Sequence, residues 1–127
     1  MNKILNVIKK EQILFDPSSI ATLRRSRGEE RVREIVEEVI FHLTDRLGLL
    51  SQAMSAGDRP LARALAGRLA AASEQVGLVG FARVARDLGA CLARGDAAAA
   101  AAVAARLDRM ADRSICRLLD HADRSAL

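Results

Sequence analysis

The chain has 127 residues, half of them apolar, and a formal net charge of +4 at pH 7. This length suits one domain with one core, and without Trp or Tyr that core must be built from Leu, Ile, Val and Ala, which favours helices over sheets. No apolar stretch reaches the length of a membrane span or of a signal peptide's apolar region, so we expect a cytoplasmic protein with no membrane segment.

The charge changes sign along the chain. Residues 1–28 and 59–94 are net basic, residues 29–58 are net acidic, and residues 95–127 are balanced. We therefore expect an acidic and a basic region on the surface. The basic residues are mostly Arg, which suits recognition of carboxylates or phosphates, although a codon bias toward Arg and Ala explains the same composition equally well.

Residues that start and end helices divide the first half of the chain into a short helix and a long helix. Asp16 and Pro17 predict the start of a short helix that ends near Arg27, because Asp caps free amides and Pro occupies a position that needs no donor. Gly28 separates it from a long helix that reaches about Ala56. The predicted buried face of this long helix is marked by apolar residues at intervals of three and four: Val32, Ile35, Val36, Val39, Leu43, Leu47, Leu50 and Met54.

Three further signals divide the second half. The run Gly57–Pro60 predicts a stop and a new start, and Gly77 predicts a tight left-handed cap after Val76. Gly95 ends the next helix, and Asp96 caps the last one. The predicted buried residues of these three helices are Ala62, Leu65, Ala66, Leu69, Ala72, Val76, Phe81, Val84, Leu88, Cys91, Leu92, Val103, Leu107 and Met110.

Long amphipathic helices with such short connections must run antiparallel to their sequence neighbours. The sequence therefore predicts an all-α, up-down-up-down four-helix bundle over residues 16–127, with a short extra N-terminal helix. Residues 1–15 form an N-terminal extension.

With the helices placed, the chain from Phe15 to about Ile115 resembles the histidine-containing phosphotransfer (HPt) domain of bacterial phosphorelays. The resemblance lies in the joint, gap-free spacing of several short features: Phe15–Pro17, Ala56–Asp58, Leu69, Val76 with Gly77, Leu88, and Arg94–Asp96. It implies the bundle fold and partners among receiver domains and histidine kinase domains.

The motif that carries the chemistry of that family differs here. HPt domains carry Ala-His-x-Leu-Lys-Gly on the third helix, and the matching stretch of this chain runs from Ala66 to Ala71. Gly67 stands at the histidine position, Ala70 at the lysine position and Ala71 at the glycine position. Phosphoryl transfer needs a nucleophilic imidazole nitrogen, which glycine does not provide. We expect no catalytic residue, no metal and no cofactor at this site.

The same stretch predicts a surface for docking. Gly67, Ala70 and Ala71 would form a patch of low relief, bordered by basic residues that suit the aspartate cluster which the resemblance implies for a receiver domain. Those basic residues are Arg63, Arg68, Arg83 and Arg86. The leading hypothesis is therefore a module that binds a receiver or kinase domain without phosphotransfer, although solvated arginines need no partner.

The sequence also allows other functions. His42, with Glu38 and Asp45 nearby in sequence, is an alternative phosphoacceptor, although a histidine in a local charge network is the plainer interpretation. His121, near the end of the last helix, is expected to be solvated.

A homo-oligomer is possible through Ile4, Leu5, Val7 and Ile8. Nucleic-acid or anionic-surface binding is weaker, because the acidic second helix repels phosphates and no aromatic platform exists.

Overall fold

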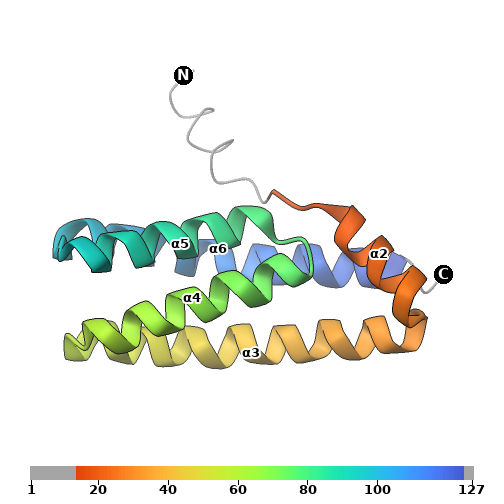
Figure 1. The fold of residues 1–127 in the computed structure, drawn as a ribbon, viewed down its shortest axis with the longest axis horizontal. Coiled ribbons are helices and arrows are strands. Elements are labelled where there is room, and N and C mark those ends of the chain that lie inside the picture. The colour runs from red at the N-terminus through yellow and green to blue at the C-terminus, as the bar shows by residue number, and fades with distance from the viewer. Residues whose placement is uncertain (1–13, 125–127) are drawn as a thin grey trace, which may run out of the picture.

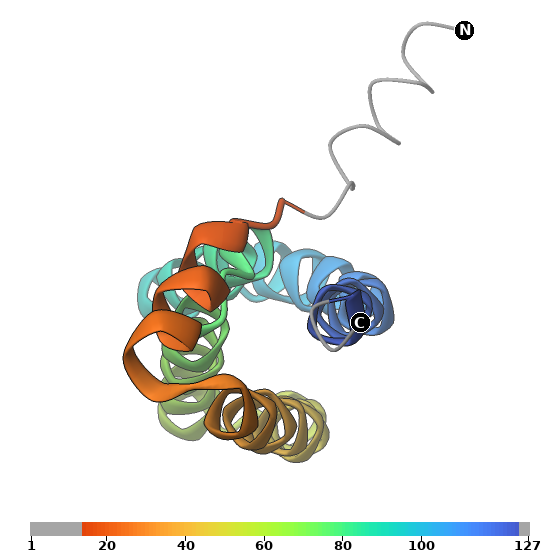
Figure 2. The ribbon, with the colours of Figure 1, turned by 90° about the vertical axis from the view of Figure 1, so that its right-hand side faces the viewer.

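The computed structural model describes residues 14–124, and their arrangement is an all-helical bundle (Figures 1 and 2). The helices are α2 (Pro17–Arg27), α3 (Glu29–Ala56), α4 (Arg59–Gln75), α5 (Val79–Arg94) and α6 (Ala97–Arg124). The four long helices run antiparallel to their sequence neighbours, and the short helix α2 crosses one end of the bundle. This confirms the predicted fold class. The residues proposed for self-association, 4–8, lie outside the described part of the chain.

The helix boundaries follow from side-chain and glycine caps. The carboxylate of Asp58 accepts a hydrogen bond from the backbone N–H of Leu61 at 3.2 Å, and that of Asp96 accepts one from Ala99 at 3.0 Å. Gly57 and Gly95 adopt left-handed conformations, with φ of 70° and 73°, which end α3 and α5. These caps leave connections of two residues after α3 and after α5, so the helices that they join must pack side by side.

The core is aliphatic, as the composition predicts, with Phe81 as its large buried aromatic residue. Most of the predicted inward positions are buried, but Leu47, Met54, Ala72 and Val103 are only partly buried. Helix α5 buries a wider face than its periodicity indicates, because it packs between α4 and α6 and also buries Ala82 and Ala85. Small residues on α5 therefore allow its two neighbours to approach closely.

The segment before α2 is packed against the turn between α4 and α5. The N–H of Asp16 donates to the carbonyl oxygen of Gly77 at 2.8 Å, and the N–H of Gly80 donates to that of Leu14 at 3.2 Å. The Phe15 ring lies 5.1 Å from the ring of His121, between centroids. His121 is therefore partly buried against an aromatic ring, where the sequence predicted a solvated side chain. These contacts fix the start of the described chain to the bundle.

Candidate functional site

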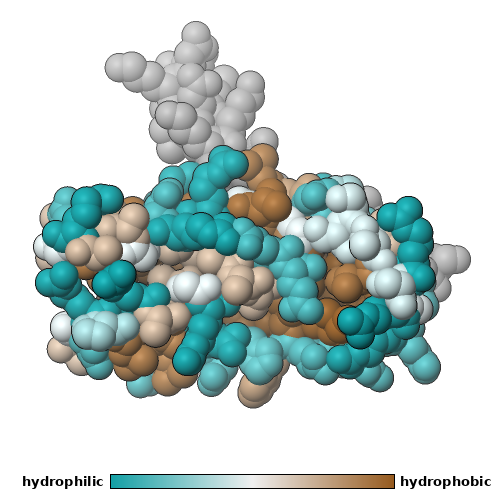
Figure 3. All heavy atoms as spheres, viewed as in Figure 1, coloured by the Kyte–Doolittle hydropathy of each residue, from teal (hydrophilic) through white to brown (hydrophobic). Residues whose placement is uncertain are grey.

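Helix α4 presents one face to the core and one to solvent. Its buried residues recur at intervals of three and four, as in any amphipathic helix. The opposite face carries Arg63, Ala64, Gly67, Arg68 and Ala71, all exposed, which we call the docking face. Figure 3 views the bundle from this side and shows pale, weakly apolar residues over α4 among hydrophilic ones. Ala64 belongs to this face because it lies three residues before Gly67, although the sequence analysis did not include it.

Gly67 lies in the middle of the docking face, within regular helix. A Cβ atom added at this position would meet no atom of another residue within 4 Å. Glycine in a helix interior costs about 1 kcal/mol relative to alanine, and here no close packing requires it. The position is therefore exposed, sterically open and without a side chain of its own.

Ala70 does not belong to the docking face. It is only 2 % exposed and lies in the core, so the prediction that it contributes to a flat exposed patch is wrong. The reason is geometric: Ala66, Ala70 and Ser73 follow one another at intervals of four and three, and this stripe is buried throughout. The patch of low relief therefore consists of Ala64, Gly67 and Ala71.

The arginines predicted to border the patch fall into two groups. Arg63, Arg68 and Arg83 are exposed, and within the described part of the chain none of them takes part in an ion pair. Arg86 of α5, in contrast, forms an ion pair with Glu74 of α4. The hydrogen bond between them holds the pKa of Glu74 below its ordinary value and raises the pKa of Arg86. Arg86 is thus engaged within the bundle, whereas Arg63 and Arg68 on the docking face form no ion pair with any described residue.

The structure resembles the crystal structure of histidine-containing phosphotransfer protein B (HptB) from Pseudomonas aeruginosa PAO1, with a TM-score of 0.80 and 22 % sequence identity. The match covers 87 % of this chain and 95 % of HptB. The two chains share one fold. No protein-family model matches the sequence, and no curated protein matches it.

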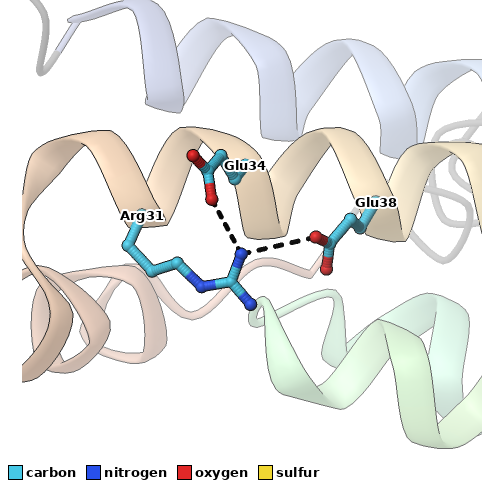
Figure 4. Close-up of polar contacts among 3 residues, drawn as sticks. All are labelled: Arg31, Glu34 and Glu38. Atoms are coloured by element: carbon cyan, nitrogen blue, oxygen red, sulfur yellow. Dashed lines mark hydrogen bonds and ion pairs between the residues drawn. The ribbon is translucent and has the colours of Figure 1, made fainter.

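His42, the alternative acceptor, is exposed on α3 and lies edge-on to the ring of Phe41, with 5.8 Å between centroids. Its predicted neighbour Glu38 pairs instead with Arg31, at 3.4 Å (Figure 4). Arg31 also bonds Glu34 at 2.8 Å, and this hydrogen bond is the main cause of the raised pKa of Arg31. One of the two carboxylates expected to orient the imidazole, that of Glu38, is therefore paired with a guanidinium, and no contact of the other, Asp45, with His42 is seen among the described residues.

Two exposed leucines, one on α3 and one on α4, were not identified from the sequence. Leu49 of α3 is 42 % exposed, and Leu61 of α4 is 44 % exposed. Leu49 falls outside the predicted buried stripe of α3, which is a signal that could have identified it, whereas Leu61 lies four residues before the buried Leu65 and periodicity alone does not separate it from the core. Leu61 and Arg68 are seven residues apart and so share one stripe of α4. The docking face thus has an apolar neighbour as well as a basic border.

Groups that could hold a metal are missing from the part of the chain that the structure describes. No three His, Cys, Asp or Glu residues come together there, and Cys91 and Cys116 are free thiols, one buried and one exposed. Among the described helices, none has both the length and the apolar content to cross a membrane.

Proposed function

We propose that this chain is a cytoplasmic docking module of a phosphorelay, which binds a receiver domain through the docking face and does not itself carry phosphate. One observation carries the proposal: a bundle with the fold of HptB has an exposed glycine, Gly67, where the family resemblance puts the phosphoacceptor histidine. Without an imidazole at that position, neither acceptance nor donation of a phosphoryl group can occur there. The alternative partner is a histidine kinase domain, which the family resemblance also implies.

Charge supports a receiver as the partner. Receiver domains that bind HPt proteins present a cluster of aspartates, and the docking face offers the guanidinium groups of Arg63 and Arg68, which pair with no residue of the described range 14–124. Between the arginines, the small residues Ala64, Gly67 and Ala71 let a partner approach the helix backbone. Such an arrangement favours encounter and orientation of an acidic partner, and its strength should fall as salt rises.

The test is binding of the full chain to a panel of receiver domains, together with transfer of label from phosphorylated receivers. We expect a salt-sensitive complex with at least one receiver and no label on the chain. Replacing Arg63 and Arg68 by Glu should abolish the complex. A matched control reverses Arg27 and Arg33, which are exposed on other helices and give the same change in net charge.

Three results would contradict the proposal. Absence of binding to every receiver would remove the partner. An equal loss of binding in the control variant would show that only net charge matters. Label on the wild-type chain would show that another residue, such as His42, accepts phosphate.

A further inference from the structure

The positive charge of the docking face has little negative charge beside it on the same helix. Helix α4 carries three arginines and one carboxylate, Glu74, which is seven residues, or about 10 Å, from Gly67 and is paired with Arg86. Arg63 and Arg68, which lie on either side of Gly67 in the sequence, form no ion pair with any residue in the described range. The two guanidinium groups of this face are therefore available to an external anion.

Gly67 provides an open position between these arginines. Arg63 lies one turn earlier on nearly the same stripe of α4, and Arg68 is the next residue, about 100° around the helix. A Cβ atom at Gly67 would meet no neighbouring helix within 4 Å, and Ala64 and Ala71, one turn away on each side, are small. A ligand group can therefore reach the helix surface there and remain within reach of both arginines.

Helix α5 places an uncharged residue beside this position. α4 and α5 are antiparallel neighbours (Figure 1), and the ion pair between Glu74 and Arg86 fixes their register. Seven residues along each helix from that pair, Gly67 and Ala93 lie about level with one another. Asp87 is the one carboxylate of α5, and it is six residues, or about 9 Å, from Ala93. The neighbouring helix thus adds no negative charge next to Gly67.

Helix α3 has one carboxylate near this level. The two-residue connection between α3 and α4 makes Asp45 and Ala70 about level, because each is twelve residues from its nearer end. Packed helix axes are about 8–10 Å apart, and Asp45 forms no ion pair with any residue between 14 and 124. Asp45 therefore reduces the positive potential at Gly67 without cancelling the charge of two arginines.

A phosphoryl group suits this position better than a carboxylate does. Guanidinium groups bind phosphate oxygens through paired hydrogen bonds. Phosphorylation of an aspartate adds about one negative charge and offers more acceptor oxygens to the two arginines. The phosphorylated form of a receiver therefore carries the ligand that matches Arg63, Gly67 and Arg68.

We propose that the docking face binds the phosphorylated form of its receiver more tightly than the unphosphorylated form, with the phosphoryl group over Gly67 and between Arg63 and Arg68. The inference rests on the proposed function, because it takes a receiver as the partner. Gly67 offers no nucleophile, so the phosphoryl group stays on the receiver's aspartate. Its hydrolysis requires a water oxygen to bond to phosphorus while the bond to the carboxylate oxygen breaks and inorganic phosphate leaves. The docked chain keeps water from that position, so the receiver stays phosphorylated for longer.

Binding of the full chain to one receiver, with and without beryllofluoride as a stable analogue of the phosphoryl group, tests the preference. We expect binding at least about fivefold tighter with the analogue at low salt, because one added negative charge meets two cations. Arg63→Gln with Arg68→Gln should remove this preference. The control, Arg27→Gln with Arg33→Gln, removes the same charge from other helices and should keep it.

Failure of this inference differs from failure of the proposed function. Equal affinity of the wild type for both forms, or a preference that survives Arg63→Gln with Arg68→Gln, would overturn the inference and leave the docking role in place. Binding of neither form would contradict the proposed function itself.

The lifetime of the phosphoryl group gives a second test. Release of inorganic phosphate from a labelled receiver should slow at least about threefold when the wild-type chain is present in saturating amount. Gly67→Gln, whose side chain occupies the position, should give less protection. Equal rates of release with and without the saturating chain, or equal protection by the wild type and Gly67→Gln, would show that the phosphoryl group does not lie over Gly67.

Discussion

The guanidinium of Arg86 on α5 donates a hydrogen bond to the carboxylate of Glu74 on α4, so one ion pair ties the helix of the docking face to its neighbour. Both side chains are about half exposed, at 54 % and 45 %, so solvent screens the pair and its contribution to stability is small. The direction in which this contribution changes with pH, however, follows from the lowered pKa of Glu74.

The first prediction concerns this pH dependence of stability. A glutamate whose pKa is lower in the folded state stabilises the protein above its unfolded pKa, and this contribution disappears as the pH falls through the folded pKa. The free energy of unfolding of the wild type should therefore exceed that of Glu74→Gln near pH 6, and the difference should shrink toward about pH 3. Urea titrations across that range provide the measurement. A difference that grows on acidification would contradict the assignment.

The second prediction concerns the glycine in the turn between α4 and α5. Gly77 has a φ of 84°, and a Cβ there would overlap the backbone carbonyl oxygen of Asp16. Gly77→Ala combines backbone strain with this clash, so we expect a loss of more than about 2 kcal/mol in the free energy of unfolding. Thermal or urea unfolding measures it, and a loss below about 0.5 kcal/mol would show that the N-terminal segment moves away at little cost.

A third prediction separates the two exposed mid-helix glycines from Gly77. Gly67 and Gly48 both have open space where a Cβ would lie. Gly67→Ala and Gly48→Ala should each raise the free energy of unfolding by about 0.4–1 kcal/mol, because alanine restricts the unfolded chain and favours helix. Urea unfolding of both variants is the check. Destabilisation by either would mean that a close packing contact occupies that position.

The fourth prediction restores the chemistry that the docking face lacks. In Gly67→His the imidazole would be exposed on α4 with room around it, so a bound phosphorylated receiver should transfer label to it. Wild type and Gly67→Gln, which offers similar bulk without a nucleophilic ring, should remain unlabelled. If Gly67→His binds the same receiver and stays unlabelled, the docking geometry differs from that of a phosphotransfer complex.

Much of the fold could be predicted from the sequence because its boundaries are local. Asp16, Asp58 and Asp96 cap helices through their own carboxylates, and Gly57 and Gly95 end them through left-handed backbone, so each signal acts within a few residues. Periodicity then identified the buried faces, since apolar side chains avoid water whichever helix covers them.

The errors at the candidate site have a different origin. Whether Ala70 is exposed depends on what packs beside it, and alanine carries little information about burial in an alanine-rich helix. The engagement of Arg86 could not be predicted because its partner, Glu74, lies on another helix. The contact between Phe15 and His121 joins residues near opposite ends of the chain, where no local pattern applies.

The contact between Phe15 and His121 also limits the order in which the parts of the bundle can fold during synthesis. Phe15 precedes all the described helices in the sequence, and its partners Arg117 and His121 lie in the last of them. During translation, α3, α4 and α5 can pair as soon as each emerges, but the end of the bundle crossed by α2 must wait for the final turns of α6. A ribosome stalled before residue 117 would therefore hold a chain whose middle is packed and whose beginning has no partner on the last helix.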